Sequence, residues 1–307
     1  MTNMAAVLWR TLLVGELVAA ILLALAVTTM SSLRAWIALP MVLGAFVLIQ
    51  YVVVVGSMLT ARAMAHESAT PLAAGSLARA TASESVSLCL VMLAMGTEPW
   101  WQGFERARET SAAARRPVLL LHGFACNRGI WRWLVPRLQI AGFAPIHALN
   151  LEPVHSDIDR LADTVERELL KMHRESGGVR ITIIAHSMGG LVARATLRSL
   201  GSEAIHRLIT LATPHHGAAI ARILPRSYAR QLCPGSSWLA ALNALQEGHW
   251  RVPVTSIYSR EDNLVVPVRS PVLLGAKLHE MHRLGHFGLL TTRRGLDCVM
   301  NALAERP

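Results

Sequence analysis

The sequence predicts an α/β protein in which a mostly parallel, doubly wound sheet follows two transmembrane helices. The first observation is a pair of long apolar stretches at 11–30 and 35–59. The second is that, from residue 117 onward, short β-branched runs alternate with amphipathic segments, which is typical of strands joined by helices on both faces of a sheet. We therefore expect a helical hairpin at 1–62, a juxtamembrane or interfacial linker region at 63–116 and an α/β domain at 117–307.

Each apolar stretch is long enough to cross a bilayer. The first, "TLLVGELVAAILLALAVTTM", carries a single charge at Glu16, and the second, "AWIALPMVLGAFVLIQYVVVVGSML", carries none. A run of about 20 apolar residues spans a hydrocarbon core. Neither stretch shows the polar face that a helix of a soluble domain presents to water. With Arg34 in the short break between them, the two stretches predict a transmembrane hairpin in a bacterial cell membrane.

A cleaved signal peptide is the alternative for the first stretch. Arg10 would then lie in its charged region and Ala24-Leu25-Ala26 would form the cleavage site. Glu16 inside the apolar run argues against this interpretation. Cleavage would still leave the second span, so both interpretations predict a membrane-bound protein.

The distribution of arginines favours a cytoplasmic α/β domain. Arg10, Arg62 and Arg79 flank the hairpin, against Arg34 alone in its connecting loop, and positive residues prefer the cytoplasmic side. A third apolar patch lies at 85–101. It is too short and too interrupted to span a bilayer, and its two tryptophans suit the membrane–water interface. If this patch does cross, the domain lies on the other face.

Composition excludes several other classes of protein. The net charge is +10, and the excess of basic residues lies after residue 104. This excess fits either an arginine-rich genome or attraction to anionic lipid headgroups, and no nucleic-acid motif accompanies it. The four cysteines and 13 histidines show no spacing typical of a metal site. We expect no metal, no cofactor and no nucleic-acid partner, and the oligomeric state stays open.

The α/β region divides into predicted elements as follows. Strands are expected at 117–124, 144–152, 179–187, 204–214, 252–262 and 270–281, with helices at 131–142, 156–178, 188–200 and 292–304. The helix at 156–178 has the clearest pattern, because Ser156 can cap it and an apolar stripe recurs along it. Between 217 and 250 the alternation lapses into short helices and a Pro-Gly turn, which could form a lid.

Ser187 lies in "AHSMGG", where a strand passes directly into a helix. A serine at such a turn can cap the helix, or its hydroxyl can be exposed on a sharp bend as a nucleophile. Asp262 and His286 also follow predicted strands, and the carboxyl ends of parallel strands meet at one edge of a sheet. A histidine can remove the serine proton, and a carboxylate can hold that imidazole in one tautomer. Glu261, next to Asp262, is the alternative acid.

Two backbone N–H groups are needed to bind the oxyanion that forms when a serine attacks a carbonyl. Met188, the residue after the nucleophile, can donate one, and Phe124, in the loop after "LLLHG", can donate the other. His186 is expected to pack beside the turn without doing chemistry, and His122 to support the loop that carries Phe124.

The motifs "LLLHGF", "AHSMGG" and "LATPHHG" together resemble α/β-hydrolases of the bacterial lipase and esterase type. The resemblance covers residues 117–307 and includes the order Ser, Asp, His along the chain. Ala185 stands where the usual pentapeptide has glycine, as it does in small Bacillus-type lipases, and the turn needs only a small side chain there. The segment "QLCPGSSWLAALN" is similar to the part of that family beside its lid.

The resemblance implies a hydrolase of carboxylic esters, in particular lipid acyl esters, that works through an acyl-enzyme. Ser187 would be the nucleophile, His286 the base and Asp262 the acid, with Phe124 and Met188 as the oxyanion hole. Two alternatives remain open: an acyltransferase or thioesterase that uses the same three residues, and a membrane scaffold without catalytic activity.

Overall fold

A computed structural model describes residues 4–30, 37–64, 74–100, 116–154, 156–223 and 229–305. Four parts of the sequence predictions lie outside these residues. They are the break that contains Arg34, the tryptophan at position 101, most of the polar linker before residue 116, and residues 224–228 of the predicted insertion.

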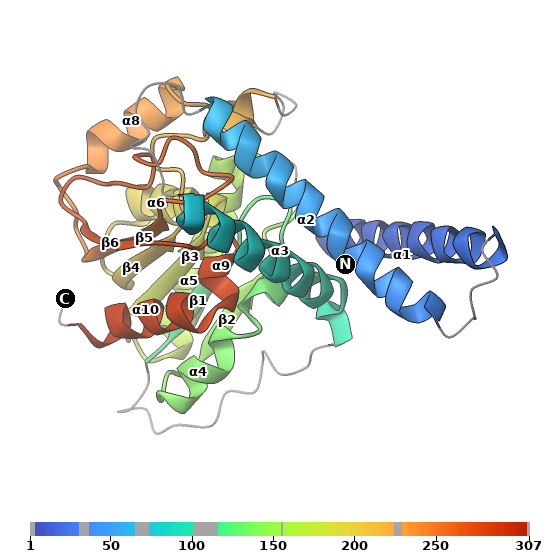
Figure 1. The fold of residues 1–307 in the computed structure, drawn as a ribbon. Helices are drawn as coiled ribbons and strands as arrows, with labels where there is room; N and C mark the ends of the chain where they lie inside the picture. Colours follow the sequence, from blue (N-terminus) through green and yellow to red (C-terminus); the bar gives the residue numbers. More distant parts are fainter. Residues whose placement is uncertain are drawn as a thin grey trace.

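The centre of the α/β domain is one parallel sheet of six strands (Figure 1). Its strands are β1 (Val118–Leu121), β2 (Ile146–Leu149), β3 (Ile181–His186), β4 (Ile205–Leu211), β5 (Val254–Ser259) and β6 (Lys277–Met281). Their order across the sheet is β2-β1-β3-β4-β5-β6, and every neighbouring pair is parallel. The doubly wound parallel sheet predicted from the alternating pattern is therefore confirmed.

Helices cover both faces of this sheet. On one face lie α5 (Ile158–Glu175), α6 (Met188–Leu200) and α8 (Ser237–Gln246), which share a buried cluster with Leu119 and Leu121 of β1. On the other face lie α4 (Leu134–Ile140), α9 (Gly288–Thr291) and α10 (Arg293–Ala304), which share a second cluster with Val118 and Leu120. The alternation of these four side chains along β1 is the period of two that a strand imposes.

Most predicted elements are a few residues longer than the observed ones, and two of these differences have a clear local cause. The last strand forms only at Lys277–Met281, because Gly275 adopts a φ of 76° and the residues before it form turns. At α5, the side chain of Asp157, and not that of Ser156, caps the helix by accepting a hydrogen bond of 2.8 Å from the N–H of Arg160. Asp157 directly precedes the first helical residue, which is the position whose side chain reaches the free N–H groups of the first turn.

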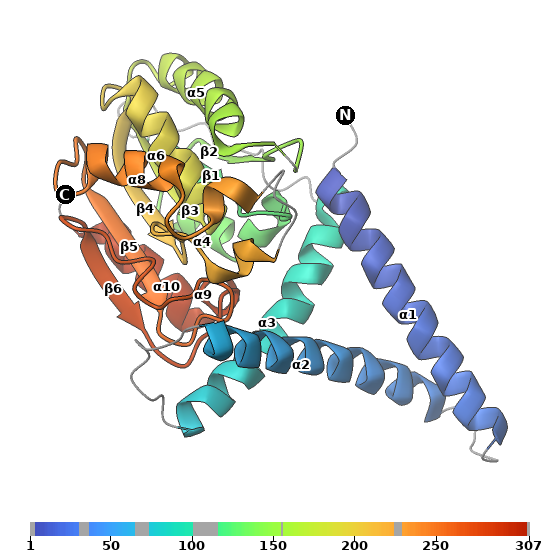
Figure 2. The ribbon, with the colours of Figure 1, turned by 90° about the horizontal axis from the view of Figure 1, so that it is seen from above.

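The two predicted spans are α1 (Met4–Met30) and α2 (Ala38–Met64), both long and apolar enough to cross a membrane. They project together from the α/β domain in Figures 1 and 2. Large apolar side chains, such as those of Leu22 and Leu48, are about 60% exposed on them. The only hydrogen bond between side chains of the two helices, within the parts that the structure describes, joins Gln50 Nε2 to Glu16 Oε2 at 2.7 Å.

The predicted linker region contains a third long helix, α3 (Ala74–Gly96), and a short turn, η2 (Glu98–Trp100). Length and composition would also allow α3 to cross a membrane, but both of its ends contact the α/β domain. Ser76 Oγ donates to Glu261 Oε1 at 2.6 Å, and Asn127 Nδ2 donates to the carbonyl oxygen of Met95 at 2.9 Å. Val91 and Met95 are buried in the cluster that includes β1.

The continuous helix differs from the short, interrupted patch that we expected at 85–101. The polar residues that interrupt the apolar pattern face protein partners instead of lipid or water. Ser87, for example, accepts a hydrogen bond of 2.7 Å from Thr291 Oγ1, and Glu84 is 1% exposed. The apolar pattern alone therefore underestimates the length of α3.

Candidate active site

Ser187 occupies a sharp turn between β3 and α6. Its φ of 54° and ψ of −129° place it in a region that L-residues rarely adopt. Its side chain makes no capping hydrogen bond, so the structure does not support the interpretation of this serine as a helix cap. Small neighbours permit the turn: a Cβ on Gly189 would lie 2.5 Å from the carbonyl oxygen of His122, and one on Gly190 would lie 2.1 Å from Thr213 Oγ1.

Asp262 and His286 lie together at the carboxyl end of the sheet. His286 Nδ1 is 2.9 Å from Asp262 Oδ2 and 3.2 Å from Asp262 Oδ1. Asp262 Oδ1 also accepts hydrogen bonds of 2.8 Å from the N–H groups of Leu264 and Val265. These contacts hold the carboxylate in one orientation. Because Nδ1 of His286 faces this carboxylate, the other ring nitrogen, Nε2, is left for other partners.

Glu261, the alternative acid, has different contacts. It accepts hydrogen bonds from Ser76 Oγ at 2.6 Å and from the N–H of Arg283 at 2.8 Å. Its carboxylate ties α3 to the turn before His286. The geometry therefore pairs His286 with Asp262.

The electrostatic surroundings of His286 favour its charged form. The side chain is 3% exposed, and burial alone would lower its pKa. The negative charge and hydrogen bond of Asp262, together with the charge of Glu84, raise the pKa above its usual value instead. Glu84 is a residue that the sequence analysis missed. The sequence gives one indication of a special role for Glu84: it is the single charged residue between Arg79 and Glu98.

His186 and His122 lie next to the candidate site, and the rings of both are buried. The ring of His186 lies 4.5 Å from the ring of His286, and burial lowers its pKa well below the usual value. His122 accepts a hydrogen bond of 2.9 Å at Nε2 from the N–H of Leu151, so its Nδ1 donates to the carbonyl oxygen of Gly123 at 2.8 Å. Burial lowers the pKa of His122 to about 4. A neutral His122 thus holds the loop that follows β1, as expected.

That loop lies against the serine. A Cβ on Gly123 would be 2.7 Å from Ser187 Cβ and 3.2 Å from Ser187 Oγ, so only glycine allows the approach. Phe124 follows Gly123 directly, and Met188 follows Ser187 as the first residue of α6. The structure therefore brings both predicted oxyanion residues beside Ser187, at the end of a helix where the helix dipole favours negative charge.

Three further histidines among the described residues have structural partners. Arg194, which is fully buried, donates from Nη1 to His215 Nδ1 at 3.3 Å, so His215 Nε2 donates to Thr210 Oγ1 at 3.1 Å. His279 lies in β6 and contacts Glu305, and His282 contacts Glu280. Within the described residues, no group of three or more His, Cys, Asp or Glu side chains has an arrangement that could hold a metal ion.

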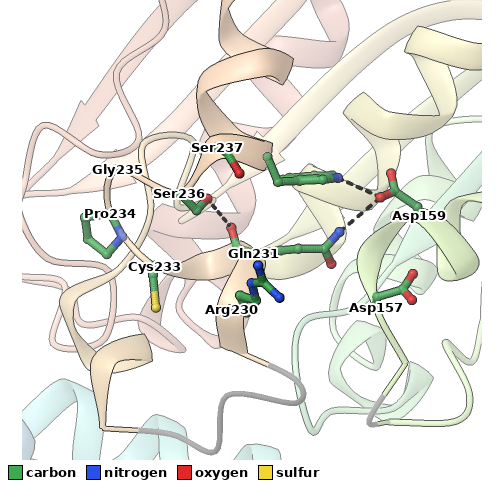
Figure 3. Close-up of a pocket in the computed structure, with 10 residues that line it drawn as sticks. Asp157, Asp159, Arg230, Gln231, Cys233, Pro234, Gly235, Ser236 and Ser237 are labelled. Atoms are coloured by element: carbon green, nitrogen blue, oxygen red, sulfur yellow. Dashed lines mark hydrogen bonds between the residues drawn. The ribbon is translucent and has the colours of Figure 1, made fainter.

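A cavity of about 1200 Å³ lies beside the insertion at 217–250 (Figure 3). The insertion has the expected short helices, η6 (Ala219–Arg222), η7 (Arg230–Leu232) and α8. Asp159 Oδ2 accepts hydrogen bonds from Trp238 Nε1 at 2.7 Å and from Gln231 Nε2 at 3.0 Å, so it fastens the insertion to α5. None of the lining residues that the structure describes belongs to the group of Ser187, Asp262 and His286.

Comparison with known proteins gives partial matches to one domain family, to triacylglycerol lipases and to GPI inositol-deacylases. The family of PGAP1-like alpha/beta domains matches residues 146–227. A triacylglycerol lipase of Burkholderia plantarii is 30% identical over 127 residues, which is 38% of this chain and 34% of the relative. A GPI inositol-deacylase of Cryptococcus neoformans is 30% identical over 73 residues, 24% of this chain and 10% of the relative. The chain thus spans about a third of the length of the lipase and a tenth of that of the deacylase.

Solved structures agree on the fold. Aspergillus fumigatus lipase B superposes with a TM-score of 0.55 and 18% identity over 66% of this chain and 54% of the lipase. Bacillus licheniformis lipase BlEst2 superposes with the same TM-score of 0.55 and 14% identity over 65% of this chain and 96% of the lipase. Both matches show a shared architecture at low sequence identity.

Proposed function

We propose that this chain, which has the α/β-hydrolase fold of the lipase and esterase type, is a membrane-anchored serine hydrolase that cleaves lipid acyl esters. The observation that carries the proposal is the grouping at one edge of the sheet. Ser187 lies on an unusual backbone bend directly after His186, and His286, paired with Asp262, packs its ring 4.5 Å from the ring of His186. An acyl ester attached to a polyol is the substrate class that the names of the lipase and inositol-deacylase relatives share.

The mechanism follows from the roles that these groups can take. His286 removes the proton of Ser187 Oγ as that oxygen attacks the ester carbonyl. Asp262, bonded to Nδ1, keeps the free nitrogen of His286 in the form that accepts this proton and stabilises the imidazolium that results. The proton then passes to the alcohol oxygen as it leaves. Water attacks the acyl-serine with His286 again as the base, which releases the acid and restores Ser187.

The oxyanion of each tetrahedral intermediate is assigned to the N–H groups of Phe124 and Met188. Gly123 supports this assignment, because its close approach to Ser187 brings the loop after β1 next to the reacting carbonyl. Removal of one such donor costs about 10²–10³ in turnover in another serine hydrolase. The backbone of this loop is therefore expected to matter more than the side chain of Phe124.

The membrane assignment rests on α1 and α2, whose exposed apolar side chains suit lipid. Both helices contact the loops of the candidate site. Trp9 Nε1 donates to the carbonyl oxygen of Ala125 at 2.6 Å, and Asn263 Nδ2 donates to Ser57 Oγ at 2.8 Å. These contacts bring the site close to the bilayer, where lipid esters are concentrated. We assign α3 to the α/β domain and not to the membrane, because Ser76 and Met95 near its two ends bond to that domain.

The side of the membrane is a separate proposal. Arg62 and Arg79 lie on the same side of the hairpin as the α/β domain, which favours the cytoplasm. Labelling of Cys233, a partly exposed free cysteine, by a membrane-impermeant maleimide would test this. We expect labelling only after the cells are opened, and labelling of intact cells would reverse the orientation.

The proposed activity is tested with the purified full chain and p-nitrophenyl esters of increasing acyl length. We expect hydrolysis, and covalent labelling of Ser187 by a fluorophosphonate. Ser187→Ala should lose both activities. Its turnover should fall on the order of 10⁶, as it does when the nucleophilic serine of subtilisin is removed. Product analysis with glycerol or a thioester separates hydrolysis from acyl transfer. Wild-type chain that neither labels nor hydrolyses any ester would leave only the non-catalytic scaffold.

A further inference from the structure

Helix α3 buries one carboxylate, that of Glu84, beside the loop that carries His286. Glu84 Oε1 accepts a hydrogen bond of 2.9 Å from the N–H of Phe287, and Glu84 Oε2 accepts one of 2.9 Å from the N–H of Gly288. These are the two N–H groups that directly follow His286 in the chain. Glu84 is separated from them by more than 200 positions in the sequence.

Gly285, which directly precedes His286, leaves room for this carboxylate because it has no side chain. A Cβ on Gly285 would lie 2.4 Å from Glu84 Cδ and 2.4 Å from Glu84 Oε2, which no side chain tolerates. The loop from Gly285 to Gly288 is thus folded around Glu84. Its conformation sets where the imidazole of His286 stands relative to Ser187.

The charged groups around this loop are few. Glu84 faces His286 and Asp262, and His286 also faces the neutral ring of His186. Burial raises the pKa of Glu84 to about 7, while the N–H groups of Phe287 and Gly288 and the charge of His286 hold it down. A carboxylate kept in so buried a place costs folding free energy unless hydrogen bonds compensate for it.

We infer that Glu84 is a positioning residue of the active site, which holds the loop of His286 in place and, in its ionised form, adds a second negative charge near the imidazolium formed during catalysis. The inference rests on the proposed function, because it takes His286 to be the base. It places one part of the site on α3, outside the α/β domain that the sequence predicts. Glu84 touches no reacting atom and acts through His286.

The test compares three variants of the full chain in detergent. Glu84→Gln removes the charge and leaves a single acceptor oxygen, Glu84→Asp keeps the charge on a shorter side chain, and Ser87→Ala is the matched control. Ser87 joins α3 to the same short helix through Thr291, at 2.7 Å, but carries no charge. Two readouts are measured across pH: kcat and KM on a short soluble ester, and the rate at which a fluorophosphonate labels Ser187.

We expect Glu84→Gln to lower kcat by about tenfold with little change in KM. Losses of this order follow when the hydrogen-bonded partner behind a metal-bound histidine is removed. Glu84, with a pKa of about 7, is ionised above that pH and there helps His286 to keep its proton, so the part of the acid limb above about pH 7 should also move to lower pH in Glu84→Gln. Glu84→Asp should lower kcat several-fold and leave the acid limb of the pH profile in place. Ser87→Ala should leave both kcat and the acid limb unchanged.

Four results would overturn the inference. One is a folded Glu84→Gln variant with the wild-type labelling rate and acid limb, which would leave the proposed function intact. Another is an equal loss of kcat in Ser87→Ala, which would mean that only the packing of α3 matters. If Glu84→Gln does not fold, a folded Glu84→Asp variant with wild-type kcat gives the same negative answer. Failure of the wild-type chain to label at Ser187 would refute the proposed function and the inference together.

Discussion

Asp262 Oδ2 lies 2.9 Å from Nδ1 of His286, while the neighbouring Glu261 bonds to Ser76 and to the backbone of Arg283. Two carboxylates adjacent in sequence are thus directed to different partners by one turn after β5. Asp262 also receives two N–H groups from the residues that follow it, which leaves it fixed against the histidine.

The first prediction separates these two acids. Asp262→Asn should bind substrate but lose about 10⁴ in kcat, because an amide holds the imidazole in the wrong tautomer, as in a serine protease. Glu261→Gln has no contact with His286 to lose and should keep kcat within a few-fold of wild type. Steady-state kinetics on a soluble ester measures both. A large loss in Glu261→Gln with little loss in Asp262→Asn would exchange the two roles.

The contrast between these residues shows what could be predicted from sequence. Ser187, Asp262 and His286 each follow a predicted strand, so the sequence places them at the same edge of a parallel sheet. The choice between Glu261 and Asp262 depends on the backbone angles of one turn, which no apolar pattern reports. The sequence predicted the elements of the sheet for the same reason, and it misjudged β6 and α5 only at their ends.

Glu84 could not be predicted by these means. It lies in a helix whose first half, "AGSLARATASE", has no regular apolar stripe, so the sequence predicts a linker region there. Its partners are N–H groups of residues 287 and 288, and such backbone contacts leave no mark on the sequence. A lone acid among small and apolar residues was the available signal, and it is a weak one.

The second prediction concerns the strained backbone of Ser187. Its φ of 54° and ψ of −129° disfavour any residue with a Cβ, and strain of this kind costs about 1–3 kcal/mol. Ser187→Gly should therefore unfold at a higher temperature than Ser187→Ala, by the equivalent of about 1 kcal/mol once the flexibility of glycine is subtracted. The matched control is Ser199, which lies within α6, the helix that Ser187 precedes.

At Ser199 the order of the two substitutions should reverse. Glycine in a helix is about 1 kcal/mol less stable than alanine, so Ser199→Gly should unfold before Ser199→Ala. Thermal unfolding of the four variants gives the comparison. The same order at both positions would mean that the turn at Ser187 stores no strain.

The third prediction is a pH dependence of stability that originates at Glu84. Burial raises its folded pKa to about 7 from a usual value of 4.5. The stabilising contribution of this group is therefore complete below its unfolded pKa and is lost as pH rises through about 7. A shift of this size corresponds to a contribution on the order of 3 kcal/mol. His286, whose folded pKa is also raised, changes stability in the same direction.

Unfolding temperatures measured between about pH 5 and about pH 8 should show this loss in the wild-type chain. Glu84→Gln has no carboxyl group to ionise at this place and should show a much smaller change across the same range. Above neutral pH the variant should be the more stable of the two, although we expect it to be the slower enzyme. Parallel pH profiles for the two chains would refute a buried, titrating Glu84.

The last prediction concerns where the α/β domain begins. The sequence analysis placed its start near residue 117, after a linker region. The structure supplies part of the core from α3, through Val91 and Met95, and ties Phe287 and Gly288 to Glu84. We therefore compare a chain that starts at residue 74, which keeps α3, with one that starts at residue 105, which loses it.

The shorter chain should fold poorly, because it lacks two buried apolar side chains worth about 1.5–3 kcal/mol each. It also leaves two N–H groups without their partner, at about 1–3 kcal/mol each. The chain from residue 74 should be soluble, label at Ser187 and hydrolyse short soluble esters. Its rate on lipid in vesicles should fall further than its rate on those esters, because α1 and α2 no longer hold it at the bilayer. Solubility, fluorophosphonate labelling and the two rates decide the matter. If the chain from residue 105 is soluble and as active as the one from residue 74, α3 is an accessory to a domain that folds without it.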